Sequence, residues 1–502
     1  MTAAATKKSS TELAAAFQQE AERLLAEFKI PGVTLGVLTP DGDHFINLGV
    51  TNLENPLPID NDTIFQIGST TKTITSLTCS VLVEQGKLDL DVPVRTYLPD
   101  FKLKDESVAA ALTTRDVLTH QGGFLGDLFH DTGEGDDAVA KVLDELAQSP
   151  QMVPMRTHWS YNNAGFYVAG RVIEMITGQT YEAAVTELVL NPLGMDHTFF
   201  FPSQIMTYRY ATGYNKIEDE MVVQRPWMMM RSAAPAGSSC SSTVSDMAKY
   251  AHYIMSGTMP ELPEAKVTQA KASEAEEKAA DDGSEKSEVP ETPTLAGMDR
   301  THLWKPVRTI GVGINAFPGE EGEIGQSWFI DQYDSATIIS HGGTTQGHQS
   351  DFWVSPDRKV GFIAMTNASN GHAMNRKLSE WVKREVLGLE RPEREEVKLS
   401  EVELEALAAT YEVVGQTYTI GVKVEDGKLA LVLPNPTTGG TENLALRFIA
   451  PERAVVMGGD ADGIGVEFLR KGDEVEFMRF GARLYPRMSP DASSASLPLD
   501  AL

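Results

Sequence analysis

The sequence predicts an α+β protein in which an antiparallel sheet flanked by helices is followed by a small all-β barrel-like domain. Two strand-like runs joined by a tight turn begin the fold, near residues 32–50. Helix-like segments follow, and alternating strand-like runs return after residue 310. Beyond residue 400 the pattern changes to short strands with turns at regular spacing, which is typical of a barrel or a sandwich.

These changes of pattern predict two domains. We expect the first over residues 1–390 and the second over residues 400–488. Residues 391–399 are charged and contain a proline, as a linker would, and residues 489–502 form a tail. Within the first domain, residues 259–297 are rich in Ala, Glu, Lys, Asp, Ser and Pro and poor in large apolar side chains. This composition predicts a disordered or loosely helical acidic insertion.

The composition restricts the classes of function. A chain of 502 residues with 41% hydrophobic and 23% charged residues fits a soluble globular protein with a large core. Its net charge of −28 argues against nucleic-acid or anionic-membrane binding, and no apolar run is long enough to span a membrane. The first 29 residues have no apolar central region or cleavage site, so we expect a cytoplasmic protein.

The two cysteines predict neither a disulfide framework nor a metal site. Cys79 and Cys240 are too few to staple a fold of this size, and their surroundings have no metal-ligand spacing. We expect them to be buried thiols, and we expect the protein to use no metal and no cofactor.

The elements of the first domain follow from local signals. Residues 11–28 form an amphipathic pattern, and residues 32–38 and 43–50 are strands around a turn that contains Gly42. A helix over residues 73–84 ends at Gly86. Further helices, which begin after hydroxyl or small polar residues, are predicted over residues 113–119 (with Thr114 as the cap), 164–177, 181–190 and 241–255.

Strand signals dominate the rest of the chain. After the insertion, strands are predicted over residues 310–316, 328–333, 336–340, 349–354 and 360–366, followed by a helix over residues 374–387. In the second domain the predicted strands are residues 418–424, 428–433, 445–449, 454–457, 465–470 and 474–480.

Ser69 and Lys72 form a Ser-x-x-Lys sequence at the start of a predicted helix. Three residues are about one helical turn, so the lysine amine lies on the same face as the serine hydroxyl. A serine hydroxyl needs a base to become a good nucleophile, and a lysine that has lost its proton can serve as that base. The helix start also offers the Ser69 backbone N–H to an oxyanion. By itself the pattern is common, and a capping serine beside a solvated lysine is the alternative.

Two further stretches accompany this pair: Tyr161-Asn162-Asn163 and His341-Gly342-Gly343-Thr344. In this order and with these separations, the chain resembles the serine β-lactamase and penicillin-binding-protein-like hydrolase family, which includes class C β-lactamases, related esterases and D-aminopeptidases. The resemblance covers roughly residues 29–387 without the insertion. It implies a β-lactamase/transpeptidase-like sheet with an all-helical subdomain, from about residue 90 to residue 253, and an active site between the two.

The resemblance also implies roles for single residues. Ser69 would be the acylated nucleophile, and Lys72 and Tyr161 would share the task of general base. A Tyr161 phenolate would require stabilisation by Lys72, because its intrinsic pKa is about 10. Asn163 would hydrogen-bond Lys72 and the substrate. An ordinary packing role for Tyr161 and helix capping by Asn163 are the alternatives.

The third stretch would supply the oxyanion hole. The backbone N–H groups of Ser69 and Thr344 would hold the oxyanion, and Gly343 would let the substrate lie close to the strand. Where β-lactamases and transpeptidases of this family carry Lys-Thr-Gly, this chain has His341-Gly342-Gly343. Because a histidine is mostly neutral above pH of about 6.5, this departure puts carboxylate recognition in doubt. Esterases and aminopeptidases of the family that the chain resembles commonly carry a histidine here, so the resemblance favours ester or amide hydrolysis. The alternative is that His341 only shapes a turn.

We therefore predict a serine hydrolase that acts through an acyl-enzyme on a small-molecule ester, an amide or a short peptide, as a carboxylesterase or a D-amino-acid-type peptidase. A β-lactamase is one alternative, and a catalytically silent, self-assembling scaffold of the same fold is another. Nucleic-acid and membrane partners are not expected, and homo-oligomer formation stays open. The second domain either shapes the cleft entrance or mediates assembly.

Overall fold

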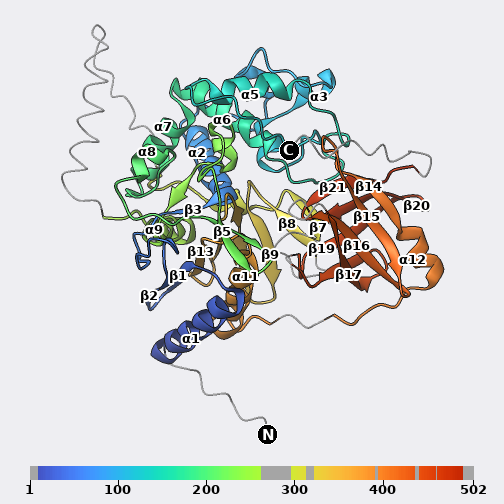
Figure 1. Cartoon of the computed structure of the whole chain (residues 1–502). Coiled ribbons are helices and arrows are strands. Elements are labelled where there is room, and N and C mark those ends of the chain that lie inside the picture. The colour runs from blue at the N-terminus through green and yellow to red at the C-terminus, as the bar shows by residue number, and fades with distance from the viewer. Residues whose placement is uncertain are drawn as a thin grey trace.

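The computed structural model describes residues 10–261, 295–312, 321–390, 394–435, 440–459 and 461–489. Most of the predicted insertion (residues 259–297), nearly all of the predicted tail (489–502) and the start of the predicted linker (391–393) lie outside the described residues. Figure 1 shows the helices from α2 (Thr71–Glu84) to α8 (Pro202–Ile205) gathered above a central sheet, with the barrel strands from β14 (Ala409–Glu412) to β21 (Arg483–Pro486) beside them.

A nine-stranded sheet is the centre of the first part of the chain. Its order is β2-β1-β13-β12-β10-β9-β8-β7, with β11 paired to β12, and the paired strands are antiparallel. The predicted antiparallel sheet is therefore confirmed. Its strands are β1 (Gly32–Thr39), β2 (Gly42–Gly49), β7 (Arg308–Val312), β8 (Glu321–Ile324), β9 (Phe329–Tyr333), β10 (Ala336–Ser340), β11 (Gly343–Thr344), β12 (Gln349–Ser355) and β13 (Val360–Thr366).

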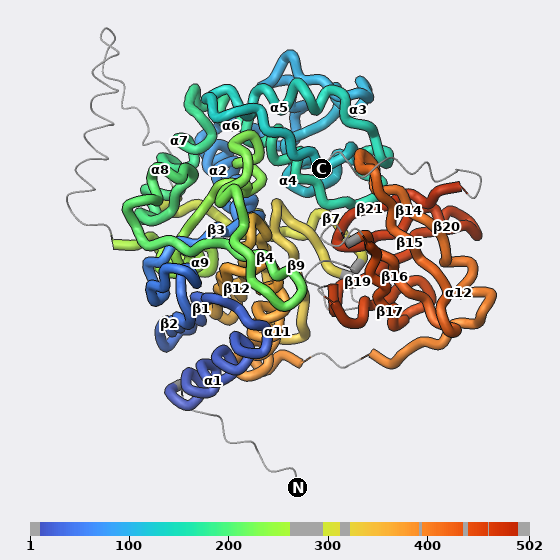
Figure 2. Tube along the Cα trace, in the orientation of Figure 1, coloured from blue at the N-terminus to red at the C-terminus, as the bar shows by residue number. Residues whose placement is uncertain are grey.

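Helices cover both faces of this sheet. On one face α1 (Ser10–Phe28) and α11 (Gly371–Glu385) pack together, and Figure 2 shows them side by side. Apolar side chains of both helices, such as Phe17 and Leu378, join strand residues in one core cluster. On the other face α9 (Val244–Ser256) contacts β1, β12 and β13. A sheet with apolar side chains on both faces needs such a cover on each side.

The helical part surrounds α2 (Thr71–Glu84), whose side chains are buried from Thr71 to Leu82. Two local predictions need correction. Thr113, and not Thr114, caps α4, because its hydroxyl accepts the Asp116 N–H while the Asp116 carboxylate accepts the Thr113 N–H. The helix predicted over residues 181–190 is α-helical only over its first half and continues as a π-helical turn (Thr186–Leu190). The shorter elements of this part are α3 (Glu106–Ala111), α4 (Thr114–Leu118), α5 (Ala138–Leu146), α6 (Ala164–Thr177), α7 (Tyr181–Val185), α8 (Pro202–Ile205), the 3-10 helices Gly68–Thr70, Val94–Thr96, Arg231–Ala236 and Thr301–Trp304, and the strands β3 (Phe65–Gln66), β4 (Tyr214–Ile217), β5 (Glu220–Val223) and β6 (Ser241–Ser242).

The second sheet is a nearly closed antiparallel barrel. Its eight strands pair in sequence order, and its ends meet where Tyr411 pairs with Arg487 and the Met488 N–H donates to the Thr410 carbonyl at 2.9 Å. The two closing strands, β14 and β21, and helix α12 were not predicted. The elements of this part are α12 (Glu401–Leu407), β14 (Ala409–Glu412), β15 (Thr419–Glu425), β16 (Lys428–Asn435), β17 (Gly440–Ala450), β18 (Arg453–Met457), β19 (Gly465–Lys471), β20 (Glu474–Phe480) and β21 (Arg483–Pro486).

The turn between β20 and β21 docks the barrel onto the loop that precedes α6. The Tyr161 N–H donates to the Ala482 carbonyl at 2.8 Å, and the Leu484 N–H donates to the Ser160 hydroxyl at 3.2 Å. Tyr161, Trp159 and Ala482 share a buried apolar cluster with strand residues of the first sheet. The barrel thereby fixes the loop that carries Tyr161. The predicted domain boundaries themselves stay a prediction.

Two smaller expectations concern cysteines and membranes. Cys79 and Cys240 are free, buried thiols, and burial raises the pKa of each to about 12. The prediction of buried thiols is confirmed. Within the described ranges, no helix combines the length and the apolar character that crossing a bilayer requires.

Candidate active site

Ser69 lies at the junction of two helical segments, in the middle of the 3-10 helix Gly68–Thr70 and just ahead of α2. Hydroxyl groups fasten this junction to the central sheet. Thr70 Oγ1 donates to the His341 carbonyl at 3.0 Å, and Ser350 Oγ donates to the Ile67 carbonyl at 2.8 Å. The predicted nucleophile is therefore held at the edge of the sheet where β10 ends and β11 begins.

Lys72 lies one turn later with its side chain fully buried. Its Nζ is 3.0 Å from Ser69 Oγ and donates to the Ala236 carbonyl at 2.6 Å. Burial lowers the pKa of this amine well below its ordinary value, and the positive charge of Arg483 lowers it further. The lowered pKa favours the neutral amine, the form that can accept the Ser69 proton, as the Ser-x-x-Lys prediction requires.

Tyr161 lies beside this pair, with its hydroxyl 3.4 Å from His341 Nε2 and its ring stacked 4.4 Å from the His120 ring. Burial raises the pKa of the phenol, although a hydrogen bond with Ser69 opposes that shift. A neutral phenol can pass a proton along but is a poor base. Of the two predicted bases, these pKa shifts favour Lys72.

His341 is buried at the end of β10. Its Nδ1 is 2.6 Å from the Gly342 carbonyl oxygen and so must carry the proton, which leaves Nε2 to accept the Tyr161 hydroxyl. Burial, with Lys72 nearby, lowers the His341 pKa to about 3. The imidazole is therefore neutral at physiological pH, as expected from the departure from Lys-Thr-Gly.

Asn163 does not make the predicted bond to Lys72. Its Nδ2 donates to Asp127 Oδ1 at 2.7 Å instead, and Arg483 Nε donates to Asp127 Oδ2 at 2.9 Å. The Arg483 guanidinium lies 4.6 Å from the centre of the Tyr161 ring. Burial alone would raise the pKa of Asp127, but Arg483, Asn163 and Lys72 together lower it.

This Asn163–Asp127–Arg483 chain was missed by the sequence analysis. Asp127 precedes Asn163 by 36 positions, and Arg483 comes from the barrel, 356 positions after Asp127. No local spacing links residues that far apart. Only a recognisable sequence motif around Arg483 could have pointed to its role, and the start of β21, where Arg483 lies, contains no such motif.

Two glycines let the strand and the nucleophile approach each other closely. A Cβ on Gly343 would lie 2.0 Å from the Ile67 carbonyl oxygen and 2.7 Å from the Ser69 backbone nitrogen. A Cβ on Gly68 would lie 2.7 Å from the Thr344 backbone nitrogen. The two backbone N–H groups predicted for the oxyanion hole thus belong to segments in direct contact.

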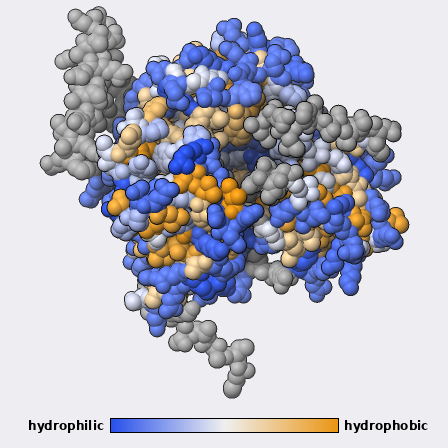
Figure 3. Space-filling view, viewed as in Figure 1, coloured by the Kyte–Doolittle hydropathy of each residue, from blue (hydrophilic) through white to orange (hydrophobic). Residues whose placement is uncertain are grey.

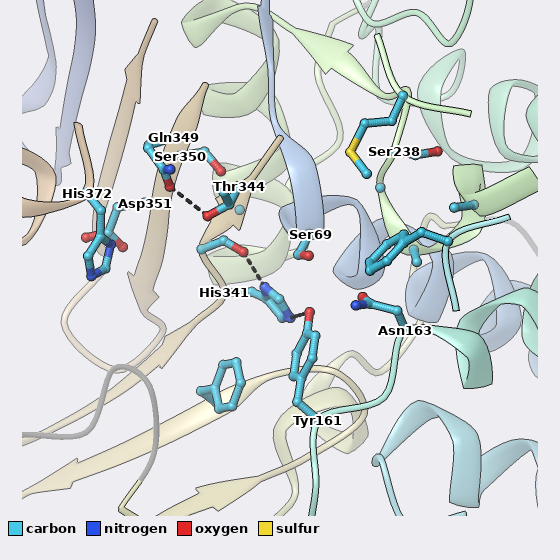
Figure 4. A pocket seen from close by; sticks show the side chains of 18 of the residues that line it. Ser69, Tyr161, Asn163, Ser238, His341, Thr344, Gln349, Ser350, Asp351 and His372 are labelled. Carbon is cyan, nitrogen blue, oxygen red and sulfur yellow. Dashed lines mark hydrogen bonds between the residues drawn. The ribbon is translucent and has the colours of Figure 1, made fainter. Parts of the chain in front are cut away.

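A cavity of about 310 Å³ collects these groups. Figure 4 shows Ser69 at its centre, with His341 and Tyr161 joined by a hydrogen bond on one side and Asn163 on another. Lys72 does not line the cavity itself. Among the described residues, no group of three or more His, Cys, Asp or Glu side chains is arranged to hold a metal ion. Of the predicted site residues, Ser69, Tyr161, Asn163, His341, Gly343 and Thr344 all line the cavity, as does Arg483.

A serine hydroxyl beside a buried lysine of lowered pKa, next to a tyrosine and at the edge of an antiparallel sheet, is the arrangement of a serine hydrolase of the Ser-Lys type. The sequence profile of the Beta-lactamase family matches residues 17–384. The chain belongs to this family, so it is a β-lactamase-family serine hydrolase.

Three comparisons describe its similarity to known proteins. The chain is 32% identical to penicillin-binding protein 4 of Amycolatopsis lactamdurans, over 49% of this chain and 65% of that protein. It is 34% identical to esterase EstB of Burkholderia gladioli, over 35% of this chain and 48% of that protein. The matches thus span less than two thirds of the length of either relative. The crystal structure of SurE with D-Leu covers 95% of this chain and 100% of its own, with a TM-score of 0.68 and 19% identity, which shows a shared fold over both sheets.

Proposed function

We propose that this protein hydrolyses an ester or an amide through an acyl-enzyme, as a carboxylesterase or a D-amino-acid-type peptidase, with Ser69 as the nucleophile and Lys72 as the base. The observation that carries the proposal is the 3.0 Å separation of Lys72 Nζ from Ser69 Oγ at a fully buried amine. Burial favours the unprotonated form of that amine, which can take the serine proton.

The reaction follows from the positions of these groups. Ser69 Oγ transfers its proton to Lys72 Nζ and attacks the substrate carbonyl carbon. The backbone N–H groups of Ser69 and Thr344 stabilise the resulting oxyanion. The proton passes from Lys72 through the Tyr161 hydroxyl to the leaving oxygen or nitrogen, and the carbonyl–leaving group bond breaks. Water then attacks the acyl carbon and gives a proton to Lys72. The bond between that carbon and Ser69 Oγ breaks, Lys72 returns the proton to Ser69 Oγ, and the acid is released.

Because His341 is neutral, the site has no fixed cation at that position. This supports an ester or an amide as the substrate, rather than a molecule that must be held there by a positive charge. The names of two relatives, a penicillin-binding protein and an esterase, agree with acyl transfer to and from a serine. The second part of the proposal, hydrolysis of a small ester or short peptide, fits a cavity of about 310 Å³, which lies at the lower end of the range for ligand pockets.

One observation favours a second candidate, a β-lactamase. The Arg483 guanidinium lines the cavity, and a cation there could attract the carboxylate of a β-lactam. Asp127 already neutralises much of that charge through its ion pair with Arg483, at 2.9 Å, so we rank this candidate second. Nitrocefin turnover, compared with turnover of p-nitrophenyl esters and D-amino-acid amides, separates the two. The proposal expects a lower kcat/KM for nitrocefin than for the best ester or amide.

Labelling with a fluorophosphonate or a penicillin probe tests the proposal directly. We expect one covalent adduct, which peptide mapping assigns to Ser69, and no adduct on Ser69→Ala. The labelling rate should rise with pH as Lys72 loses its remaining protons. Ser76 lies on α2, the helix that follows Ser69, and its hydroxyl donates to the Gln326 carbonyl, so Ser76→Ala is a matched control that keeps the adduct. An adduct on any other residue, or none on the wild type with either probe, would contradict the proposal.

Replacing Gly343 with alanine is expected to lower ester turnover by about 100-fold or more, the usual effect of losing an oxyanion donor. The new methyl group would meet the backbone at Ile67 and Ser69, so β11 must move away from the nucleophile. Turnover of p-nitrophenyl acetate and the melting temperature are measured together. Gly342→Ala is the comparison, because a Cβ there meets only the Ser350 carbonyl oxygen, at 3.1 Å. Equal losses in the two variants would contradict this account of the oxyanion hole.

A further inference from the structure

A second cavity, of about 410 Å³, lies next to the active-site cavity. We call it the aromatic pocket; its walls include Phe200, Phe201, Ile205, Trp227, Met229 and Ser239. Met229 also lines the active-site cavity, and Ser238 lines that cavity while Ser239 lines the aromatic pocket. The two cavities are therefore adjacent across one short stretch of chain. Figure 3 shows hydrophobic residues gathered beside a hollow on this face of the molecule.

The lining of the aromatic pocket is suited to an uncharged, apolar group. Two charged residues line it, Glu134 and Arg231. Glu134 is exposed to solvent, and Arg231 forms ion pairs with Glu182 at 2.8 Å and Asp136 at 2.9 Å. That cation is therefore neutralised within the protein and offers little to an anionic ligand. The remaining walls named above are aromatic or aliphatic apart from Ser239, and apolar walls with a few fixed polar atoms are the usual makeup of a small-molecule site.

Ser239 supplies an independent indication that the pocket binds a ligand. Its side chain is only 3% exposed, and its Oγ has no hydrogen-bonding partner among the described residues. A buried hydroxyl without a partner costs free energy, and a polar atom of a bound molecule would remove that cost. The ligand should therefore combine an apolar body with a hydrogen-bonding atom, as an acyl chain or side chain next to an ester or amide group does.

The wall shared by the two cavities can adapt to different chains. Met228 lines the aromatic pocket, Met229 lines both cavities, and both side chains are only partly buried. Methionine side chains are unbranched and flexible, and they form binding surfaces that adjust to varied apolar groups. A substrate attached at Ser69 could thus extend past Met229 without a rigid barrier.

We infer that the aromatic pocket is a substrate subsite, which binds a large hydrophobic group of the ester or amide that Ser69 attacks. The inference rests on the proposed function and adds its substrate class: molecules with a long apolar chain or a bulky apolar side chain, rather than acetyl-sized ones. Ser239 would hydrogen-bond the polar group that joins this apolar part to the rest of the substrate.

A chain-length series tests the subsite. For p-nitrophenyl esters from acetate to decanoate, and for acetate esters of alcohols from ethanol to decanol, kcat/KM is measured on the wild type. We expect it to rise about fourfold for each added methylene in one of the two series, since each buried methylene stabilises by about 0.8 kcal/mol. The series that responds identifies the side of the scissile bond that enters the pocket.

Two variants alter the pocket without altering the cavity around Ser69. Met206 lines the pocket and is 72% exposed, so Met206→Asp places a charge at its mouth with little risk to folding. Ser239→Val removes the unpartnered hydroxyl. We expect each to lower kcat/KM for the longest substrate by about tenfold or more, and Met206→Asp to leave the acetate value within about twofold. Met175, which is 48% exposed and outside both pockets, provides the control Met175→Asp, expected to behave as wild type.

Measuring ligand binding to a variant that cannot turn over substrate tests the subsite independently of the proposed hydrolysis. Ser69→Ala protein is titrated by calorimetry with N-methyl amides of butyric and decanoic acid and with decyl and butyl acetamides. The inference requires tighter binding of the longer member of one pair, and loss of that difference in Ser69→Ala/Met206→Asp. Equal binding of short and long members, or a length preference that survives Met206→Asp and Ser239→Val, would overturn it. If the wild type cleaves no ester or amide while the length-dependent binding remains, the proposed function fails and the pocket assignment stands.

Discussion

Replacing Lys72 with alanine is expected to lower the rate of Ser69 acylation by about 10³- to 10⁴-fold, the upper range for loss of a general base. Lys72 Nζ lies 3.0 Å from Ser69 Oγ, and its side chain is fully buried. The measurement is the pseudo-first-order rate of labelling by a fluorophosphonate probe. In the wild type this rate rises with pH through the lowered pKa of Lys72, and in the alanine variant that rise is absent.

Lys72→Arg distinguishes a base from a fixed cation. Arginine keeps a positive charge near Ser69 but does not lose its proton in proteins. If Lys72 is the base, the arginine variant should be as inactive as the alanine variant. If a folded arginine variant keeps more than about a tenth of the wild-type labelling rate, then Lys72 acts as a fixed cation and not as the base.

The stability of Lys72→Met gives a second, independent measure of the Lys72 pKa. Because burial lowers this pKa in the folded state, the unfolded chain binds a proton at Lys72 that the folded protein does not, at any pH between the two pKa values. The contribution of Lys72 to the free energy of unfolding therefore rises with pH in that window, up to its unfolded pKa of about 10.4. Methionine does not titrate. The melting temperature of Lys72→Met minus that of the wild type should fall as pH rises, and a constant difference would show a lysine that is protonated in both states.

Replacing Tyr161 with phenylalanine is expected to lower kcat for an ester by about 10²- to 10³-fold with little change in KM, since only the proton relay is removed. The ring keeps its stacking on His120, at 4.4 Å, and its contact with the Arg483 guanidinium, at 4.6 Å. The fold should therefore be retained, which the melting temperature checks. The variant should keep the wild-type pH dependence, because burial raises the Tyr161 pKa and the phenol does not set the profile.

Tyr167→Phe is the matched control for this experiment. Tyr167 is a buried tyrosine on α6, a few residues from Tyr161, and its hydroxyl donates to the Leu128 carbonyl at 2.8 Å without lining the active-site cavity. Its replacement removes one hydrogen bond, worth about 1 kcal/mol of stability, and should leave kcat within about threefold. Comparable kcat losses at the two positions would mean that Tyr161 acts by packing alone.

We expect the pH dependence of kcat/KM to show no titration of His341. Its pKa lies at about 3, so the imidazole stays neutral over the assay range. The acid limb of kcat/KM then belongs to Lys72, and it should survive in Tyr161→Phe.

Local sequence signals predicted most of the elements that carry the site. The bounds of β10, β13 and α6 were predicted to the residue, since alternation or helical periodicity is clear there and Gly178 ends α6 in a left-handed conformation. The barrel ends were missed. β14 and β21 have four residues each, too few for alternation to stand out, and they become strands because their ends pair across the barrel, Tyr411 with Arg487.

The sequence by itself determined the Ser69–Lys72 pair, because a separation of three residues at a helix start brings the hydroxyl and the amine together whatever surrounds them. It also predicted the neutral histidine in place of a lysine at position 341. Only the tertiary structure decided which group serves better as the base, since the pKa values of Lys72 and Tyr161 depend on how completely distant segments exclude water. It likewise decided that Asn163 binds Asp127 and that the barrel delivers Arg483 to the cavity, because those contacts join residues that no local pattern connects.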